Sequence, residues 1–341
     1  MPLSNPYDII VKNNISDYID EEIKKVYKNK KVYIVTDQRV GNLYLEKITT
    51  SLKSFDVKCI VIKGYEESKS LEMYAFICEE LIKMGAVRGE LLIALGGGVI
   101  GDLVGFVAAT LYRGMPFVQI PTSLLAQVDS SIGGKTGIDF IGHKNILGAF
   151  NQPKLVLIDP LFLKSLPIRE LKNGYAEMIK HAFIYSPKLL SLLKKNKLNV
   201  NEEIIHENLM IKRAHVIGDE FDNGVRMKLN FGHTFGHIIE LKNNCLHGEA
   251  VIDGMLCAVD YSIDLGFVNS NVKEELIGLY KTLELEYHEY DYHEFLSDVK
   301  YDKKNIAETI NFILLEEIGN AIIYKVRLGE LVWKYWLDLK N

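Results

Sequence analysis

The chain has 341 residues, of which 48% are hydrophobic and 25% are charged, and its formal net charge is −5. This composition is that of an ordinary soluble globular protein, and the length exceeds what one hydrophobic core usually organises, so we expect two domains. The negative charge argues against the broad basic surface that nucleic acids or anionic membranes require, which leaves a small molecule as the expected partner.

The first half of the sequence alternates short β-branched runs with helix-like stretches. The runs that predict strands are residues 32–36, 57–62, 91–95, 116–120 and 155–158. Strands that alternate with helices predict a mostly parallel sheet covered on both faces, with ligands at the carboxyl ends of the strands. The apolar segment 91–112 has the length of a membrane span, but its five glycines and Asp102 favour a buried strand, a glycine turn and a buried helix.

The second half has a helical texture. Apolar residues recur with helical period in residues 169–194, 201–218, 233–243, 248–265 and 272–283. We therefore predict an N-terminal α/β domain over residues 1–158 and a mostly α-helical C-terminal domain over residues 159–341. Two last apolar stretches, 310–315 and 321–326, fit either a terminal hairpin or a covering helix.

Four cysteines are far apart in the sequence, without CxxC spacing. The N-terminus has no basic region followed by an apolar run, so we expect no signal peptide. Both features predict free thiols in the reducing cytoplasm.

A glycine-rich turn at residues 96–102, GGGVIGD, follows a predicted strand and opens a predicted helix. Its spacing fits G-x-G-x-x-G, in which main-chain N–H groups at a helix N-terminus bind a pyrophosphate. The usual dinucleotide fold has an acid at the end of the next strand, where this sequence has QIPT, and the available ribose-binding acid is Asp37, which precedes the glycines. We therefore predict nucleotide binding on an atypical Rossmann-like topology.

Residues 129–136, DSSIGGKT, are similar to a phosphate-binding P-loop. Asp129 stands where that loop needs its first glycine, so we exclude a P-loop. Lys135, Lys144 and Asn145 are nevertheless suited to bind a phosphate or a nucleotide, because ammonium groups beside glycine-rich main chain form anion sites. The alternative is that both lysines are solvated surface residues.

Histidines gather near the start of the last predicted helices. His233 and His237 are four residues apart and project to one helix face, and His247 follows after the next turn. Two or three such histidines can bind zinc, and Glu177 could supply an oxygen ligand. The alternatives are structural histidines and an exposed ion pair of Glu177 with Lys180. Spacing alone pairs His233 with His237.

Together these blocks resemble the 3-dehydroquinate synthases of the sugar-phosphate cyclase superfamily, from about residue 32 to residue 326. The resemblance rests on GGGVIGDLVGFVA, YRGMPFVQIPTSLLAQVDSSIGGKTGI, HKNILGAF, LPIREL, GYAEMIKH, LNFGHTFGH and LHGEA, in this order. It implies a dehydroquinate synthase-like fold, NAD, a divalent metal (usually zinc, with cobalt possible) and a homodimer. The implied reaction converts 3-deoxy-D-arabino-heptulosonate 7-phosphate to 3-dehydroquinate and phosphate in the shikimate pathway, with transient oxidation by NAD, β-elimination, re-reduction and intramolecular aldol closure.

The resemblance also implies roles for individual residues. The metal ligands would be Glu177, His233 and His247, with His237 turned toward the substrate. The residues placed at the nucleotide would be Asp37, Glu66, Lys69, Gly98, Val99, Ile100, Gly101, Asp102, Thr122, Ser123, Asp129, Lys135, Lys144, Phe162, Leu163, Lys164 and Ser165. The residues placed at the substrate would be Arg113, acting across the dimer, and Lys135, Asn145, Lys180, Lys212, Arg226, Asn230 and His237. Residues 302–304, DKK, are similar to a phosphate-binding tail motif.

Three other functions are compatible with parts of the sequence. Sister cyclases such as 2-deoxy-scyllo-inosose synthase act on substrates without a carboxylate, whereas Arg226 near Lys212 favours a carboxylate. Metal-dependent alcohol or glycerol dehydrogenases would release NADH as a product. A binding protein without catalysis is disfavoured by the intact Glu177, His233, His247 and Lys135.

Overall fold

The computed structural model describes residues 5–243, 245–288 and 309–327, and its contacts divide the chain into two compact units. Unit 1 consists of Met1–Leu171 and Asn201–Leu209, and unit 2 consists of Lys172–Val200 and Met210–Asn341. The predicted boundary after residue 158 lies earlier in the chain than this division. Phe162 lies beyond the predicted boundary, and its buried side chain packs into a core of the unit 1 sheet.

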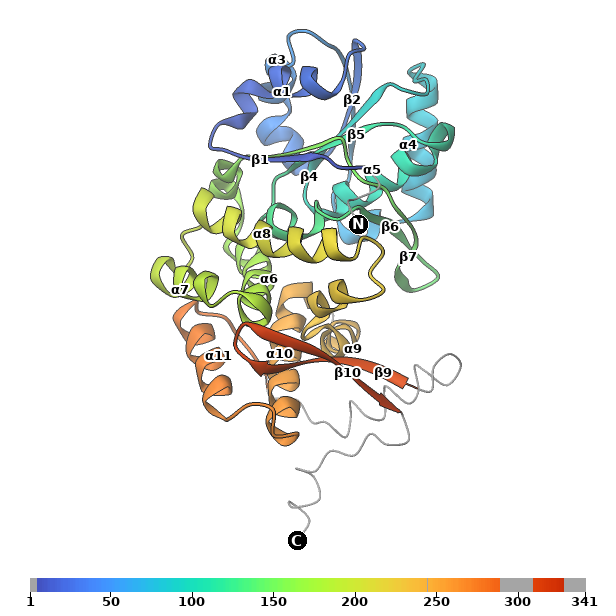
Figure 1. Cartoon of the computed structure of the whole chain (residues 1–341). Helices are drawn as coiled ribbons and strands as arrows, with labels where there is room; N and C mark the ends of the chain where they lie inside the picture. The colour runs from blue at the N-terminus through green and yellow to red at the C-terminus, as the bar shows by residue number, and fades with distance from the viewer. Residues whose placement is uncertain (1–4, 244, 289–308, 328–341) are drawn as a thin grey trace. The chain divides into compact units, whose positions relative to one another are not determined.

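Unit 1 is built on a six-stranded sheet in which all strands are parallel (Figure 1). The order across the sheet is β1-β8-β5-β4-β2-β3. The strands are β1 (Asp8–Val11), β2 (Lys31–Asp37), β3 (Asp56–Ile62), β4 (Leu91–Gly96), β5 (Phe117–Pro121) and β8 (Leu155–Ile158). The predicted parallel sheet is confirmed, and the edge strand β1 is an addition that the sequence pattern did not predict.

The strand order explains how the predicted ribose-binding acid, Asp37, can precede the glycine turn of residues 96–102 in the sequence. Without β1, the order is that of a flavodoxin-like doubly wound sheet, because the chain runs outward from β2 to β3 and then crosses to β4 on the other side of β2. The switch point therefore lies between β2 and β4. Thr36 pairs with Leu95, so Asp37 and Gly96 come next at the carboxyl ends of neighbouring strands.

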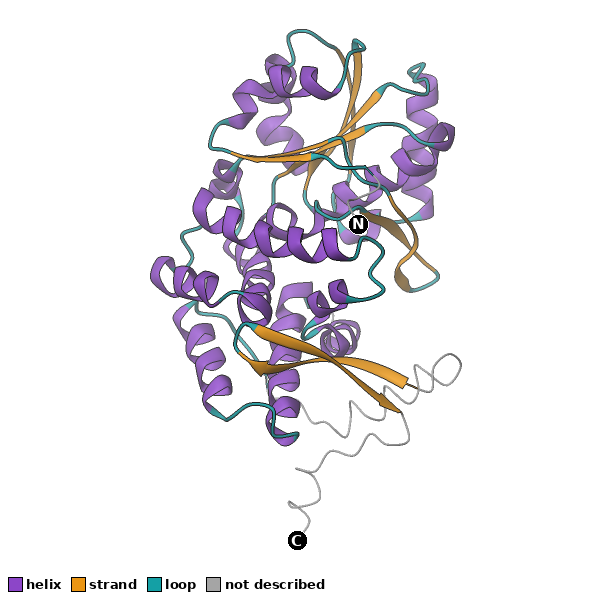
Figure 2. Cartoon of the chain, in the orientation of Figure 1, coloured by secondary structure: helices purple, strands orange, loops and turns teal. Residues whose placement is uncertain are grey.

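Alternate residues of the sheet pack into two hydrophobic cores, one on each face. Leu92 and Ala94 belong to one core, and Leu91, Ile93 and Leu95 belong to the other. All residues of β4 are buried, as expected for a central strand of a parallel sheet. Helices cover both faces (Figure 2). The helices of unit 1 that precede β5 are α1 (Ile19–Val26), α2 (Gln38–Val40), α3 (Glu46–Ser51), α4 (Leu71–Lys83) and α5 (Gly98–Thr110).

An antiparallel ribbon of β6 (Lys135–Phe140) and β7 (His143–Phe150) extends unit 1. Gly137 and Gly148 face each other in it. A Cβ atom on Gly148 would lie 2.5 Å from the carbonyl oxygen of Thr136, so the two chains can approach only without a side chain there. The ribbon was not predicted, because these glycines interrupt the alternation that indicates a strand.

Unit 2 is mostly helical, as predicted. Its helices, two of which begin in unit 1, are α6 (Ile168–Tyr185), α7 (Pro187–Asn196), α8 (Glu202–Gly218), α9 (His233–Asn243), α10 (His247–Asp264) and α11 (Asn271–Thr282). The predicted helix over residues 169–194 is two helices, because Ser186 caps α7 and Pro187 begins it. The last apolar stretches form an antiparallel hairpin of β9 (Thr309–Glu317) and β10 (Asn320–Arg327), which decides between the two alternatives.

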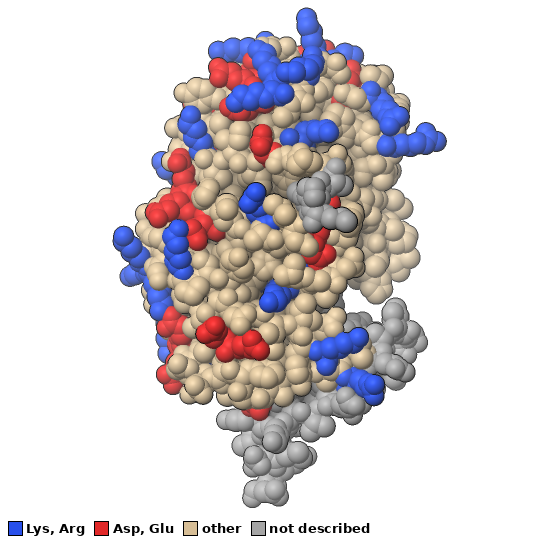
Figure 3. Space-filling model, in the orientation of Figure 1, with Lys and Arg blue, Asp and Glu red and all other residues tan. Residues whose placement is uncertain are grey.

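The distribution of surface charge and the state of the cysteines agree with what the composition predicts. Acidic and basic side chains are interspersed on the face drawn in Figure 3, without a broad basic patch. Cys59, Cys78, Cys245 and Cys257 form no disulfide. Within the described ranges, no helix is long and apolar enough to cross a membrane. The apolar segment 91–112 forms the predicted strand, turn and helix.

Candidate metal centre and nucleotide site

Three helices of unit 2 each bring one side chain to a common point. Glu177 lies within α6, while His233 and His247 are the first residues of α9 and α10. Their ligand atoms lie within 4.8 Å of one another. Nε2 of His233 and Nε2 of His247 are 3.6 and 3.5 Å from Oε1 of Glu177. Tetrahedral zinc ligands at about 2.1 Å from the metal are about 3.4 Å apart, so one cation could contact all three.

The buried carboxylate of Glu177 fits a cation. The side chain is fully buried, its Oε2 accepts a hydrogen bond from Nζ of Lys180, and its Oε1 has no hydrogen-bond donor. A buried oxygen without a donor costs about 1–3 kcal/mol, a cost that a bound cation would remove. One carboxylate and two imidazoles are a donor set that suits zinc and leaves positions open for substrate.

The outer nitrogen of each histidine has an acceptor. Nδ1 of His233 lies 3.2 Å from the carbonyl oxygen of Phe231, and Nδ1 of His247 lies 3.1 Å from Oε2 of Glu240. A proton on Nδ1 leaves the lone pair of Nε2 directed at Glu177, which is the tautomer that a metal ligand needs. The local structure thus prepares both rings for coordination.

His237 does not join this group, although helix spacing pairs it with His233. Its ring centre is 5.5 Å from that of His233 and 6.3 Å from that of His247. Its nitrogens are not among the atoms that converge on Glu177, and neither is Cys245. His247 takes the third position because α10 begins beside the start of α9, a tertiary contact that spacing within one helix cannot reveal.

Neighbouring charges hold the three side chains in different protonation states. Burial raises the pKa of Glu177, but the positive charge of Lys180 is the largest of the opposing effects, and the pKa is held well below its usual value. Burial, followed by the charge of Lys180, lowers the pKa of His233 far below its usual value, so this ring is neutral. Burial also lowers the pKa of His247, but Glu177 and Glu240 outweigh it and raise the pKa to about 9. A metal therefore competes with a proton for His247.

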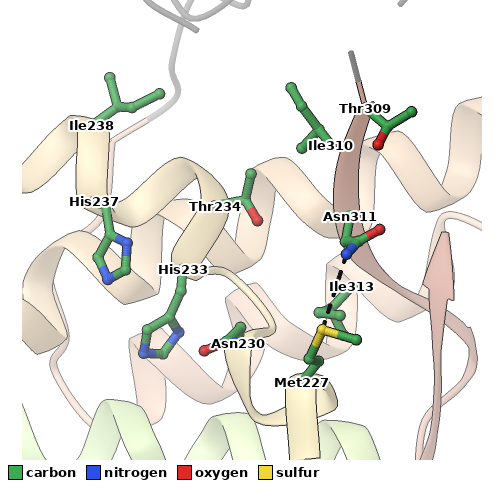
Figure 4. A pocket seen from close by; sticks show the side chains of 10 residues that line it. All are labelled: Met227, Asn230, His233, Thr234, His237, Ile238, Thr309, Ile310, Asn311 and Ile313. Carbon is green, nitrogen blue, oxygen red and sulfur yellow. Dashed lines mark hydrogen bonds between the residues drawn. The ribbon is translucent and has the colours of Figure 1, made fainter. Parts of the chain in front are cut away.

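A pocket of about 420 Å³ opens beside these ligands (Figure 4). Helix α9 forms one wall and β9 forms the opposite wall. The residues that line it are Met227, Asn230, His233, Thr234, His237, Ile238, Thr309, Ile310, Asn311 and Ile313. The volume is within the range of small-molecule sites, and the ring of His233 belongs to both the pocket and the ligand group. Thr234 and the β9 residues were not predicted, because nothing local in the sequence indicates that the hairpin faces α9.

The predicted substrate-binding cations of unit 2 are buried. Lys180, Lys212 and Arg226 are 2%, 7% and 2% exposed. Lys180 pairs with Glu177, as described above. Nη1 of Arg226 donates to the carbonyl oxygen of Glu220 at 2.6 Å.

In unit 1, the glycine turn leaves the start of α5 open. The helix begins at Gly98, and its N-cap residue is Gly97. Because glycine has no side chain, the N-cap residue does not accept a hydrogen bond from the N–H groups of the first turn. A Cβ atom on Gly97 would lie 3.3 Å from Oγ of Ser123, and one on Gly98 would lie 3.1 Å from Oγ of Ser130. Side chains at these positions would fill the approach to a helix terminus that is suited to bind a phosphate.

The acid at the end of β2 is held in place by the main chain. Oδ1 of Asp37 accepts hydrogen bonds from the N–H groups of Arg39 and Val40, both at 2.9 Å. Gly64 packs directly against it, because a Cβ atom there would lie 2.2 Å from Cβ of Asp37. The geometry fits a ribose-binding acid at the switch point of the sheet.

A charged network lies among the other predicted nucleotide residues. Nζ of Lys69, a residue that is 5% exposed, lies 2.8 Å from Oδ2 of Asp102 and 3.9 Å from Oε1 of Glu66. Lys144 lies 4.0 Å from the same oxygen of Glu66. Burial lowers the pKa of Lys69, but Asp102 and Glu66 outweigh it and raise the pKa. The structure therefore brings these four residues together.

Some predicted nucleotide residues are structural in this fold. The side chain of Ile100 belongs to the core, and Gly101 packs on Gln119, whose Oε1 would lie 2.7 Å from a Cβ there. Phe162 is buried against Tyr44, with ring centres 4.5 Å apart. These residues could reach a nucleotide mainly through their main chain. The hydroxyl oxygen of Tyr44 lies 2.5 Å from Oγ of Ser165, and Tyr44 was not among the predicted nucleotide residues.

The remaining predicted residues occupy turns and strand ends. Thr122 donates its N–H to the carbonyl oxygen of Gly96 at 2.9 Å. Lys135 begins β6, and the N–H of Asn145 in β7 donates to Oδ1 of Asp139 at 2.7 Å. Arg113 is exposed in a turn after α5, with a left-handed φ of 60°.

Val99 lies in the first turn of α5, Asp129 follows β5, and Leu163 and Lys164 follow β8. Residues 302–304 lie outside the described residues.

Comparison with known proteins identifies the family. A family model described as 3-dehydroquinate synthase N-terminal matches residues 59–173, and one described as 3-dehydroquinate synthase C-terminal matches residues 174–305. The chain belongs to the 3-dehydroquinate synthase family. It is 42% identical over 334 residues to the 3-dehydroquinate synthase of Clostridium beijerinckii, with 94% of this chain and 95% of that protein covered.

Solved structures of 3-dehydroquinate synthase-like sugar-phosphate cyclases share the fold. ValA, a 2-epi-5-epi-valiolone synthase from Streptomyces hygroscopicus solved with NAD+ and Zn2+ bound, matches with a TM-score of 0.85 and 25% identity, covering 100% of this chain and 99% of that chain. A 2-deoxy-scyllo-inosose synthase complexed with carbaglucose-6-phosphate, NAD+ and Co2+ matches with a TM-score of 0.84 and 22% identity, covering 95% of both chains. The predicted fold class is therefore confirmed.

Proposed function

We propose that this chain is a phosphorus–oxygen lyase that converts 3-deoxy-D-arabino-heptulosonate 7-phosphate to 3-dehydroquinate and phosphate, a step of the shikimate pathway. The observation that carries the proposal is the buried Oε1 of Glu177, which has no donor and faces Nε2 of His233 and of His247 beside a pocket. The identity to a curated 3-dehydroquinate synthase over nearly the whole chain supports the same reaction.

The proposed cofactors are NAD and a divalent metal, either Zn2+ or Co2+. Unit 1 would bind NAD at the carboxyl ends of β2 and β4, and unit 2 would hold the metal through Glu177, His233 and His247. When bound, the metal would lower the pKa of a substrate hydroxyl and NAD would accept a hydride from the carbon that carries it. The solved relatives with NAD+ and either ion support this pair of cofactors.

The side chains of the chain itself would bind and orient the substrate. The positive charge of Lys180 holds Glu177 as an anion, which is the state that a metal ligand needs. Arg226 and Lys212 would bind the substrate carboxylate, because a guanidinium makes its strongest hydrogen bonds with an anionic partner. Asn230 and His237 line the pocket, where they could contact substrate hydroxyls and move a proton near the phosphate. Correct orientation would supply much of the rate.

The nucleotide would act catalytically in this proposal. Bound at the carboxyl ends of β2 and β4, it would supply a hydride acceptor that gives the hydride back within the same turnover. The overall change would then be β-elimination of phosphate with intramolecular aldol closure, for which no external oxidant is needed. Net NADH should therefore stay at zero while phosphate accumulates.

The test is phosphate release from 3-deoxy-D-arabino-heptulosonate 7-phosphate, with NADH absorbance followed in the same cuvette. We expect phosphate without net NADH, and loss of phosphate release after the protein is stripped of metal with a chelator. Full activity after thorough stripping would contradict the metal centre. NADH that accumulates with a simple polyol would instead support a dehydrogenase, and phosphate released from a hexose 6-phosphate that has no carboxylate would support a sister cyclase.

We also propose a homodimer in which Arg113 of one chain reaches the phosphate of its partner's substrate. The residue is exposed and sits in a left-handed turn, which fits a side chain held for contact outside its own chain. Light scattering should give twice the chain mass of 38.8 kDa, and Arg113→Ala should raise KM without loss of metal. A monomer with full activity would contradict this part of the proposal. The cytoplasmic location stays a prediction.

A further inference from the structure

One face of α9 carries three groups of the metal region. His233, His237 and Glu240 are spaced at i, i+4 and i+7, so they lie along one side of the helix. His233 belongs to the ligand group and His237 lines the pocket. Glu240 is 8% exposed, and its Oε2 lies 3.1 Å from Nδ1 of His247 at the start of α10. A carboxylate buried to this degree requires polar partners, and one of them is a proposed ligand.

The main chain around His247 is held on both sides. The N–H of Gly248 donates to Oδ1 of Asn173 at 2.6 Å, and the N–H of Leu246 donates to Oε2 of Glu249 at 2.9 Å. Gly248 also packs tightly, because a Cβ atom there would lie 2.2 Å from the carbonyl oxygen of Asn173. Asn173 lies one turn before Glu177 on α6, so the bond ties the backbone of His247 to the helix that carries the carboxylate ligand. These contacts fix the main chain on either side of His247, but they do not fix the rotation of its imidazole ring.

The two ligand histidines differ in how their rings are held. The acceptor for His233 is a main-chain carbonyl, which no substitution removes. The acceptor for His247 is the side chain of Glu240, so its orientation depends on a residue that can be changed. We propose that Glu240 is a positioning residue, which holds the Nδ1 proton of His247 so that Nε2 faces Glu177 and the metal. This inference rests on the metal site of the proposed function.

Two substitutions separate the acceptor from its charge. Glu240→Gln keeps an oxygen that can accept from Nδ1 but removes the negative charge, whereas Glu240→Ala removes the acceptor. Loss of an outer partner of a metal-bound histidine typically weakens metal affinity about 10–100-fold. We expect Glu240→Ala to lose affinity on that scale and Glu240→Gln to recover most of it.

The experiment uses the full chain and measures Zn2+ affinity by competition with a chromophoric chelator. Co2+ is then added in place of Zn2+, and the visible absorption of the bound ion reports the geometry of its ligands. We expect a changed Co2+ spectrum in Glu240→Ala and a spectrum close to that of the parent in Glu240→Gln. Lys242→Ala, an exposed substitution on the same helix, is the matched control and should change neither measurement.

Several outcomes would overturn the inference. Zn2+ affinity within about twofold of the parent in Glu240→Ala would show that the contact does not position the ring. Equal losses of Zn2+ affinity in Glu240→Ala and Glu240→Gln would show that the negative charge of Glu240 supports metal binding, and that its orientation of the His247 ring does not. Should Glu240→Ala fail to fold, the Co2+ spectrum of Glu240→Gln still decides, because a changed spectrum contradicts rescue. If the parent chain itself bound no Zn2+, the proposed metal centre would fail and not merely the role of Glu240.

Discussion

The two candidate sites of this molecule are built in different ways. The nucleotide site of unit 1 consists of strand ends, a glycine turn and the start of α5, with Asp37 and Gly96 at the carboxyl ends of neighbouring strands. The metal centre of unit 2 consists of single side chains from α6, α9 and α10, which the tertiary fold brings within 4.8 Å. A site made of main chain depends on the absence of side chains, whereas a site made of side chains depends on each of them. Substitutions should therefore act on the two sites separately.

The largest effect should follow loss of one metal ligand. His247→Ala removes an Nε2 that lies 3.5 Å from Glu177, so we expect metal content near zero and phosphate release reduced on the order of 10³-fold or more. NAD binding, measured by calorimetry, should be nearly unchanged. His206→Ala, an exposed histidine of α8, is the control and should keep both metal and activity. Full activity in His247→Ala would contradict the metal centre.

Loss of Lys180 should destabilise unit 2 in the absence of metal. The change Lys180→Met removes the ammonium group that pairs with Oε2 of the buried Glu177, and loss of one partner of a buried ion pair typically costs about 3 kcal/mol of unfolding free energy. Added Zn2+ should restore part of this stability, because a cation then faces the same carboxylate. Chemical denaturation with and without Zn2+ measures both effects. A change below about 0.5 kcal/mol without metal would mean that the ion pair contributes little.

A side chain in the glycine turn should weaken nucleotide binding and leave the metal centre intact. In Gly98→Val the Cβ atom would meet Oγ of Ser130 at 3.1 Å, and the rest of the side chain would crowd the approach to α5. We expect NAD affinity to fall about tenfold or more, which corresponds to about 1.4 kcal/mol. Calorimetry with NAD and metal analysis of the same sample test both statements. Loss of metal in this variant would contradict the separation of the two sites.

The smallest effect should come from a glycine that belongs to neither site. Gly278 is exposed in the middle of α11, and no atom lies within 4 Å of the position of a Cβ atom there. Gly278→Ala should raise the unfolding free energy by about 0.5–1 kcal/mol, because alanine loses less backbone entropy in a helix. Affinities for NAD and metal should not change. Destabilisation in this variant would indicate an undetected contact on that face.

The sequence pattern predicted those parts of the fold that local physics determines. The runs at β2, β3, β4, β5 and β8 are short and rich in apolar and β-branched residues, and the periodic stretches became α8 to α11. The weakest signals failed: β1 has four residues, and the β6–β7 ribbon is interrupted by glycines. The break between α6 and α7 was also missed, although Ser186 and Pro187 are a local signal for it.

The two candidate sites also differ in how much of each could be predicted from local sequence. The glycine turn and the acid Asp37 could be read from residue type and position, since the main chain itself forms the anion site. Helix spacing within α9 paired His233 with His237, and the sequence offered His247 as a third candidate ligand. Only the resemblance to a family put His247 in the ligand set in place of His237. The outer contact of Glu240 and the β9 wall of the pocket had no sequence signal, because each depends on which surfaces of two separate elements meet.

By itself, the amino-acid sequence determined the long helices, the central strands of the parallel sheet and the residue types of both sites, since these follow from side-chain volume, hydrophobic period and the special geometry of glycine. Only the tertiary structure decided which histidine faces Glu177, which side chain orients it and which strand closes the pocket. The physical reason is that contacts between side chains of different helices and strands depend on how whole elements pack, and no local pattern encodes that packing.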